Sequence, residues 1–138
     1  MLTDMESIGV RYAHNIADLL IDPFHPAHHG QKPAHELLSA AILHVMGTEL
    51  APSLVSVLDL LSDPTRNHKL ILKRMMEAKH LGDRPHPQVV ASAQRLLSKS
   101  RSERAGVFTI ALSQLERAIT RTRAAATRQE DRRRTRVA

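Results

Sequence analysis

Apolar residues recur every three or four positions along almost the whole of this 138-residue chain. That spacing gathers them on one face of an α-helix, whereas a half-buried strand needs apolar and polar residues in alternation. No segment alternates for long enough to indicate a strand. The sequence therefore predicts an all-α fold, a compact bundle of five to six helices without an internal repeat.

Capping residues, prolines and glycines predict where these helices begin and end. The signals are capping boxes at Thr3/Glu6 and Ser100/Glu103, a stop at Asp22-Pro23, first-turn prolines at Pro33 and Pro87, a cap at Ser53 and an end at Gly47. We expect the fourth helix to open at Asp63-Pro64 and to run for about four turns. The sixth helix should fray beyond Ile119, where its apolar stripe thins to alanine and threonine.

The first and the sixth predicted helices each have a broad apolar face that we expect to point inward. In the first helix the face contains Met5, Ile8, Tyr12, Ile16, Leu19 and Leu20. In the sixth helix it contains Phe108, Ala111, Leu112, Leu115 and Ile119. Since hydrophobic residues make up 42% of the chain and only three residues are aromatic, the core must be aliphatic.

The net charge of +6 belongs to the C-terminal end of the chain. Residues 1–116 hold 12 basic and 12 acidic residues, while residues 117–138 hold eight arginines and two acids. We therefore divide the chain into an all-α domain, residues 1–116, and a basic tail, residues 117–138, that we expect to be frayed or disordered. Such a tail can bind phosphate groups non-specifically, and the candidate nucleic-acid-binding residues are Arg128, Arg132, Arg133 and Arg134.

Several classes of protein are disfavoured by what the sequence lacks. With no cysteine there can be no disulfide and no cysteine-ligated zinc site, as expected in a reducing compartment. The N-terminal residues do not form a signal-peptide pattern, and the longest uncharged apolar run, residues 37–46, is shorter than a membrane-spanning helix requires. We expect a soluble cytoplasmic domain that makes no membrane contact.

The stretch DPFHPAHHGQKPAH, residues 22–35, contains four of the nine histidines. His25, His28, His29 and His35 could form a metal site with Asp22 and Glu36, but their spacing matches no helical zinc motif. The alternative is a polar loop, punctuated by prolines, that leads into the second helix. We favour the loop and predict no metal and no cofactor.

No catalytic motif is present. The five glycines form neither a phosphate-binding loop nor a dinucleotide-binding fingerprint, and there is no cysteine nucleophile or GxSxG sequence. We therefore expect no catalytic residues and no enzyme activity in this chain.

The fourth helix is expected to bury His68, Ile71, Leu72, Met75 and Ala78. Its opposite side would carry a basic face, which consists of Arg66, Lys69, Lys73 and Arg74, with Leu70 as an exposed apolar residue among them. Such a face is typical of a solvated helix. It could instead bind an acidic partner or a phosphate, so these five residues are the candidate partner-binding site.

Four sequence blocks, taken in order, resemble a known family. They are YAHNIADLLIDP (12–23), AHELLSAAILHVM (34–46), APSLVSVLDLLSDP (51–64) and HPQVVASAQRLLSKSRSERAGVFTIALSQL (86–115). Together they are similar to the all-α domain of the coupling proteins of type IV secretion and conjugation, the TraG-like family. The resemblance covers residues 12–115. It departs at Ala105, where the family tends to have serine, and after Leu115, where the family usually turns at Asp-Pro.

The resemblance implies a particular context for the chain. In that family the all-α domain is inserted in a RecA-like motor domain, which belongs to a hexameric ATPase anchored in the bacterial inner membrane. The domain faces the cytoplasm and takes part in recognising cargo, either a relaxase with its DNA or a secreted effector protein. We therefore expect a cargo-recognition domain, and the alternatives are a small nucleic-acid-binding protein that uses its arginine-rich tail and a metal-dependent helical protein.

Overall fold

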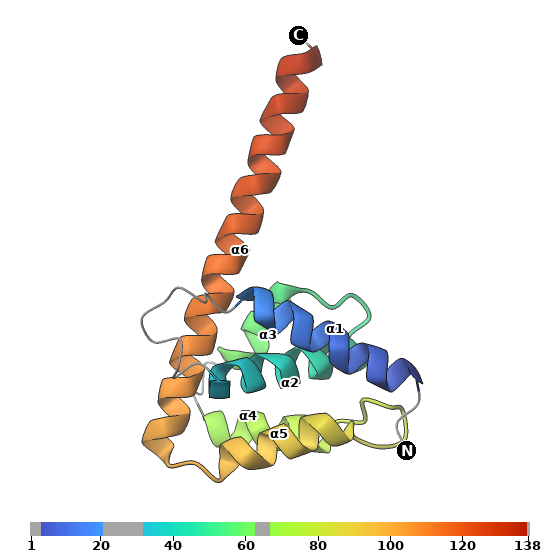
Figure 1. Ribbon diagram of the computed structural model, residues 1–138, viewed down its shortest axis with the longest axis vertical. Coiled ribbons are helices and arrows are strands. Elements are labelled where there is room, and N and C mark those ends of the chain that lie inside the picture. Colours follow the sequence, from blue (N-terminus) through green and yellow to red (C-terminus); the bar gives the residue numbers. More distant parts are fainter. Residues whose placement is uncertain (1–3, 21–31, 63–66, 138) are drawn as a thin grey trace.

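The computed structural model describes residues 4–20, 32–62 and 67–137, and these form six α-helices and no strand (Figure 1). The helices are α1 (Asp4–Leu20), α2 (Lys32–Thr48), α3 (Leu54–Leu61), α4 (His68–Glu77), α5 (Pro87–Leu97) and α6 (Arg101–Val137). The all-α prediction is confirmed for this part of the chain. None of the helices there is both long enough and apolar enough to cross a membrane.

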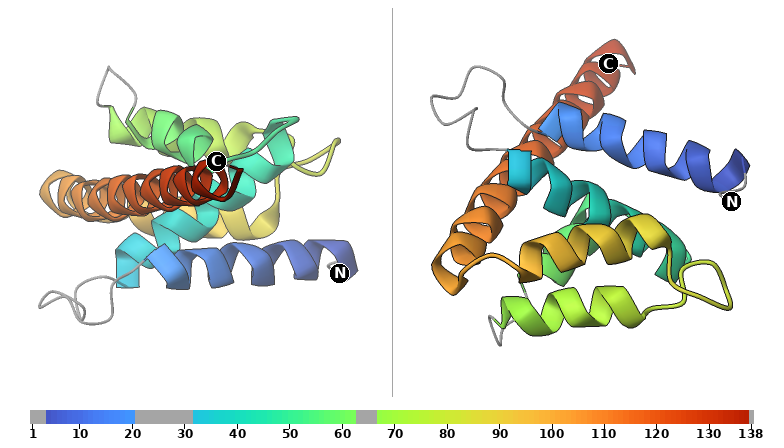
Figure 2. Two further views of the ribbon diagram at one scale, coloured as in Figure 1. Left: turned by 90° about the horizontal axis from the view of Figure 1, so that it is seen from above. Right: turned by 60° about the horizontal axis from the view of Figure 1, so that its bottom comes forward.

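Helix α2 lies at the centre of the bundle. It contacts α1, α3, α5 and α6, with α1 on one side of it and the paired helices α4 and α5 on the other (Figure 1 and Figure 2). Nine of its 17 residues are buried, and they include Leu37, Leu38 and Ala41. A helix that is buried on several sides must be apolar around much of its circumference, and its sequence has that character.

The core is aliphatic, as its composition predicted. The largest fully buried side chains are leucine, isoleucine, methionine and valine, and Phe108 is the one aromatic residue among them. Helix α1 faces α2 through small residues, because Ala13 and Ala17 are completely buried. Tyr12 and Leu19, predicted to face inward from the same helix, are instead 54% and 81% exposed. The buried stripe of α1 is therefore narrower than its apolar pattern suggested.

Most of the expected helix ends are confirmed. The side chain of Ser53 accepts a hydrogen bond from the amide of Ser56 at the start of α3, and that of Ser100 accepts one from Glu103 at the start of α6. Pro33 and Pro87 lie in the first turns of α2 and α5, and α2 ends one residue after Gly47. Thr3 and Asp22-Pro23 lie outside the described residues.

The start of α4 was predicted wrongly. It begins at His68, where the side chain of Asn67 accepts a hydrogen bond from the amide of Leu70 over 3.1 Å. Asparagine is among the best capping residues, so it provides a start signal inside the segment that we assigned to helix. The helix has 10 residues, which is fewer than the four turns expected, and residues 63–66 lie outside the described part.

Helix α6 also differs from the prediction, because it continues to Val137 where we expected fraying after Ile119. Its last buried residue is Ile119, so the packed body extends three residues beyond the boundary drawn at residue 116. Residues 120–135, the α6 extension, are all exposed (Figure 1). The extension contains no glycine or proline, and lengthening an existing helix avoids the cost of nucleation.

Truncation of Leu38 provides a test of the central position of α2. Leu38 is fully buried, whereas Leu112, predicted to point inward from the sixth helix, is only partly buried against the core. We expect Leu38→Ala to lower the free energy of unfolding by about 2–5 kcal/mol and Leu112→Ala by less than about 2 kcal/mol. Urea denaturation of both variants measures the difference, and equal losses would contradict the assigned burial.

Two helical glycines form a matched pair for a second test. A Cβ atom on Gly47 would lie 2.8 Å from the Cβ of His80, while one on Gly106 would meet nothing within 4 Å. Gly47→Ala should therefore destabilise the protein by about 1–3 kcal/mol through overpacking. Gly106→Ala should stabilise it by about 0.5–1 kcal/mol, because alanine is the better helix former. Thermal unfolding of the two variants measures both changes in stability, which should have opposite signs.

Candidate protein-binding surface

The structure confirms the orientation predicted for α4. Ile71, Leu72 and Met75 are buried, and Lys69, Lys73 and Arg74 are exposed. Leu70, expected to be an exposed contact, is half-buried instead. Arg66 lies outside the described residues. Three of the five candidate partner-binding residues are therefore exposed, and Lys69 and Lys73, one turn apart, share a face.

On its inward side α4 contacts α6 through two stacked rings. The His68 imidazole stacks on Phe108 of α6, with ring centroids 4.1 Å apart and an interplanar angle of 15°. Burial lowers the pKa of His68, and the charge of Arg104 lowers it further. The neutral ring therefore serves as a packing group that joins α4 to α6.

An apolar groove lies between α1, α2 and α3. It has a volume of about 270 Å³, and its lining consists of Tyr12, Ile16, Ile42, Val45, Met46, Pro52, Ser53, Leu54 and Val57. Tyr12 and Met46 are 54% and 36% exposed, so the groove presents large apolar side chains to its opening. The sequence did not reveal this groove, because its residues come from three helices and the loop before α3, and those in the helices appear locally as ordinary inward positions.

A polar pocket lies on the other side of α3, towards α4. It has a volume of about 290 Å³ and is lined by His44, Val45, Glu49, Ser56, Asp59, Leu60, Ile71 and Arg74. Val45 contributes to both hollows, so the apolar groove and the polar pocket adjoin across α2 and α3. We call these two hollows together the α3 surface.

Three histidines form a hydrogen-bonded chain beside the polar pocket. The backbone N–H of His86 donates to Nδ1 of His80 over 3.0 Å, and Nε2 of His80 lies 2.8 Å from Nδ1 of His44. Because Nδ1 of His80 accepts, the neutral ring must carry its proton on Nε2 and donate it to His44. The close approach at Gly47 allows this contact between α2 and the loop before α5.

Burial is the main reason why the rings of His80 and His44 stay neutral. It lowers the pKa of His80 to about 4, with His44 and His86 as further causes. Burial also lowers the pKa of His44, although Glu49 acts in the opposite direction. The sequence does not reveal the pairing of His44 with His80, because the two residues lie 36 positions apart.

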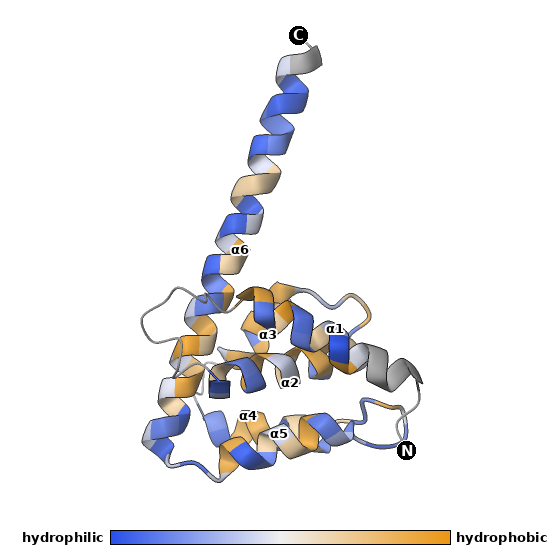
Figure 3. Ribbon diagram, in the orientation of Figure 1, coloured by the Kyte–Doolittle hydropathy of each residue, from blue (hydrophilic) through white to orange (hydrophobic). Residues whose placement is uncertain are grey.

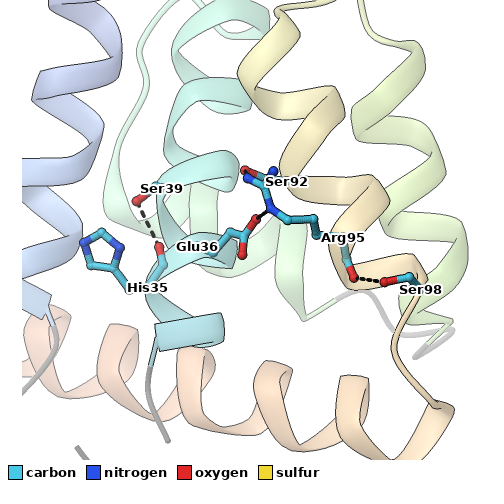
Figure 4. Close-up of polar contacts among 6 residues, drawn as sticks. All are labelled: His35, Glu36, Ser39, Ser92, Arg95 and Ser98. Carbon is cyan, nitrogen blue, oxygen red and sulfur yellow. Dashed lines mark hydrogen bonds and ion pairs between the residues drawn. The ribbon is translucent and has the colours of Figure 1, made fainter. Parts of the chain in front are cut away.

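The histidine-rich stretch falls mostly outside the described residues, which resume at Lys32. His35 is described, and its Nε2 lies 2.7 Å from a carboxylate oxygen of Asp18, which joins α1 to α2. Glu36 accepts a hydrogen bond from Arg95 of α5 (Figure 4). Among the described residues no three histidine, aspartate or glutamate side chains are grouped to hold a metal ion.

The candidate nucleic-acid-binding arginines, Arg128, Arg132, Arg133 and Arg134, all lie exposed on the α6 extension. They do not share one face, because consecutive residues of a helix diverge by about 100°. Arg134 pairs with Glu130 at 3.4 Å. The structure therefore separates a group of residues that the sequence had treated as one cluster.

Comparison with known protein families, with curated proteins and with solved structures finds no match to this chain. The likeness to the coupling-protein domain therefore depends on the four sequence blocks.

The histidine chain predicts an acid-sensitive fold. The folded pKa of His80 lies below the unfolded value of about 6.5, so the unfolded state binds more protons between about pH 6.5 and pH 4. The stabilising effect of the neutral His80 ring should be complete above pH 6.5 and should be lost as the pH is lowered through this window. Because the ring is only partly buried and solvent screens its interactions, we expect a loss of roughly 1–2 kcal/mol, smaller than the full pKa difference would give. Urea denaturation at several pH values measures the loss. His80→Gln, which does not titrate, should flatten the profile, and an unchanged slope would contradict the assignment.

Proposed function

We propose that this protein is a cargo-recognition domain of a type IV coupling protein. The support from sequence is the order of the four blocks that resemble the TraG-like all-α domain. The support from structure is that these blocks contribute to α1, α2, α3 and the α5–α6 pair, which pack together around α2. The blocks therefore belong to one packed unit, as expected for segments of a single domain.

The α3 surface is the observation on which the binding proposal rests. Tyr12 and Met46 border a concave apolar groove, and exposed apolar hollows of this kind are common sites of protein interaction. Glu49, Asp59 and Arg74 lie in the adjoining pocket and would provide polar contacts around an apolar anchor. Apolar anchors with a polar rim are typical of protein interfaces.

The bound cargo would be a relaxase or a secreted effector protein, recognised through its C-terminal segment. Under this proposal the groove holds apolar side chains of that segment, and the exposed face of α4 with Lys69 and Lys73 attracts acidic ones. ATP hydrolysis would belong to a RecA-like motor domain of the same hexameric protein, into which this domain is inserted. The chain itself would bind cargo without catalysis, at the cytoplasmic face of the inner membrane.

Calorimetry with C-terminal peptides of relaxases and effectors from the same secretion system tests the proposal. We expect a dissociation constant in the micromolar range, typical of a transient contact of modest area. Tyr12→Glu should weaken binding at least tenfold with little effect on thermal stability, because the side chain is more than half exposed. Lys69→Glu combined with Lys73→Glu should also leave the melting temperature nearly unchanged, and it should weaken binding of acidic peptides.

Leu19→Glu is the matched control, because Leu19 is an exposed apolar residue of α1 that does not line the groove. This variant should bind the peptides like the unmodified protein. An equal loss of binding in Leu19→Glu would contradict the groove as the site. No binding to any cargo segment would contradict the cargo function itself.

A further inference from the structure

Four exposed arginines of α6 lie along one line of the helix surface. At about 100° per residue they fall within an arc of roughly 60°. These residues, which we call the arginine row, are Arg117, Arg121, Arg128 and Arg132. The row spans 15 residue steps, or roughly 22 Å at 1.5 Å per residue.

The acidic residues of the same segment do not neutralise this row. Glu130 lies on the opposite half of the helix and pairs with Arg134, outside the row, at 3.4 Å. Asp131 lies beside the row, about 70° from its centre by the same helical geometry. The row therefore forms a strip of the α6 surface that carries four arginines, with an acidic side chain only at its edge.

The helix that carries the row projects away from the packed body. The ribbon shows α6 extending well beyond the other helices, and its outer part is mainly hydrophilic (Figure 1 and Figure 3). An α-helix with side chains is about 10–12 Å wide, close to the width of about 12 Å of the DNA major groove. Residues 120–135, which carry three of the four arginines, are all exposed and therefore accessible to such a duplex, and Arg117 is exposed on the part of α6 that packs on the body.

The composition of the extension argues against an apolar partner. Residues 120–135 contain no apolar side chain larger than alanine. A helix that lies in a membrane surface needs large apolar residues on one face, and a coiled coil needs them at a and d positions. A helix rich in arginine, with small threonine and alanine residues between, is complementary to a nucleic acid, because guanidinium groups bind phosphates in bidentate geometry.

We propose that the arginine row binds the phosphate backbone of double-stranded DNA without sequence preference. Over 22 Å one strand of a duplex presents about six phosphates, so four arginines have ample partners. The row contains two pairs with like charges at i and i+4, Arg117 with Arg121 and Arg128 with Arg132, which repel each other in the free helix. Bound phosphates relieve that repulsion, so DNA binding also stabilises the helical state of the extension.

This inference does not depend on the cargo function, and it is tested on the full chain. The probes are two fluorescently labelled 20-base-pair duplexes of unrelated sequence, and the measurement is anisotropy at several salt concentrations. With four phosphate contacts the logarithm of the binding constant should fall with a slope of about −3.6 against the logarithm of salt concentration. The two duplexes should bind equally within about threefold, and a strong preference for one would overturn the non-specific mode.

Two double variants remove the same charge from different faces of α6. Arg121→Gln with Arg128→Gln removes half of the row, and it should weaken binding at least tenfold and reduce the salt slope by about 1.8. Arg123→Gln with Arg133→Gln lies outside the row and should change affinity by less than about twofold. Circular dichroism of both variants checks that the helix is retained.

Three results would overturn the proposal. Equal weakening by the two double variants would mean that the whole charge of the tail, and no particular face, attracts DNA. Binding to vesicles that contain phosphatidylserine as tightly as to the duplexes would assign the row to anionic membrane surfaces. The absence of binding to either duplex at 50 mM salt would show that the arginine row is not a DNA-binding site.

Discussion

The burial of α2 is the constraint on which the rest of the structure depends. This helix contacts four others, and a single helix can be surrounded in this way only if most of its side chains are apolar or small. Leu37, Leu38 and Ala41 meet that requirement, and Ala13 and Ala17 allow α1 to pack against it. Because aromatic side chains are nearly absent from the chain, many close aliphatic contacts stabilise the bundle.

The C-terminal end of α2 joins this core to the surface. At Gly47 the backbone of α2 approaches His80 closely, and one turn earlier His44 accepts a hydrogen bond from the same ring. His44 also lines the polar pocket of the α3 surface. Protonation of His80 and His44 would therefore disturb both the contact between α2 and the loop before α5 and the border of the proposed cargo site, which couples stability to binding at mildly acidic pH.

The two proposed binding regions are physically different and lie on different parts of the molecule. The α3 surface is concave, partly apolar and formed by several helices, so its shape depends on the packing of the body. The arginine row belongs to one projecting helix and depends on charge and helical periodicity alone. If both proposals hold, a domain with both binding regions would hold a cargo protein and DNA at once, and neither region would need the other in order to bind.

The all-α class, the aliphatic core and most helix starts were determined by the sequence itself, because they depend on periodicity and capping within a few residues, as at Ser53 and Pro87. The exception is α4, for which we predicted the start at Asp63-Pro64 and did not recognise Asn67 as a cap. Tertiary structure alone decided that Tyr12 is exposed, that His44 meets His80, and that the apolar groove adjoins the polar pocket. Each of these depends on how separate segments of the chain pack together, and the repeating pattern of a single helix carries no information about its neighbours.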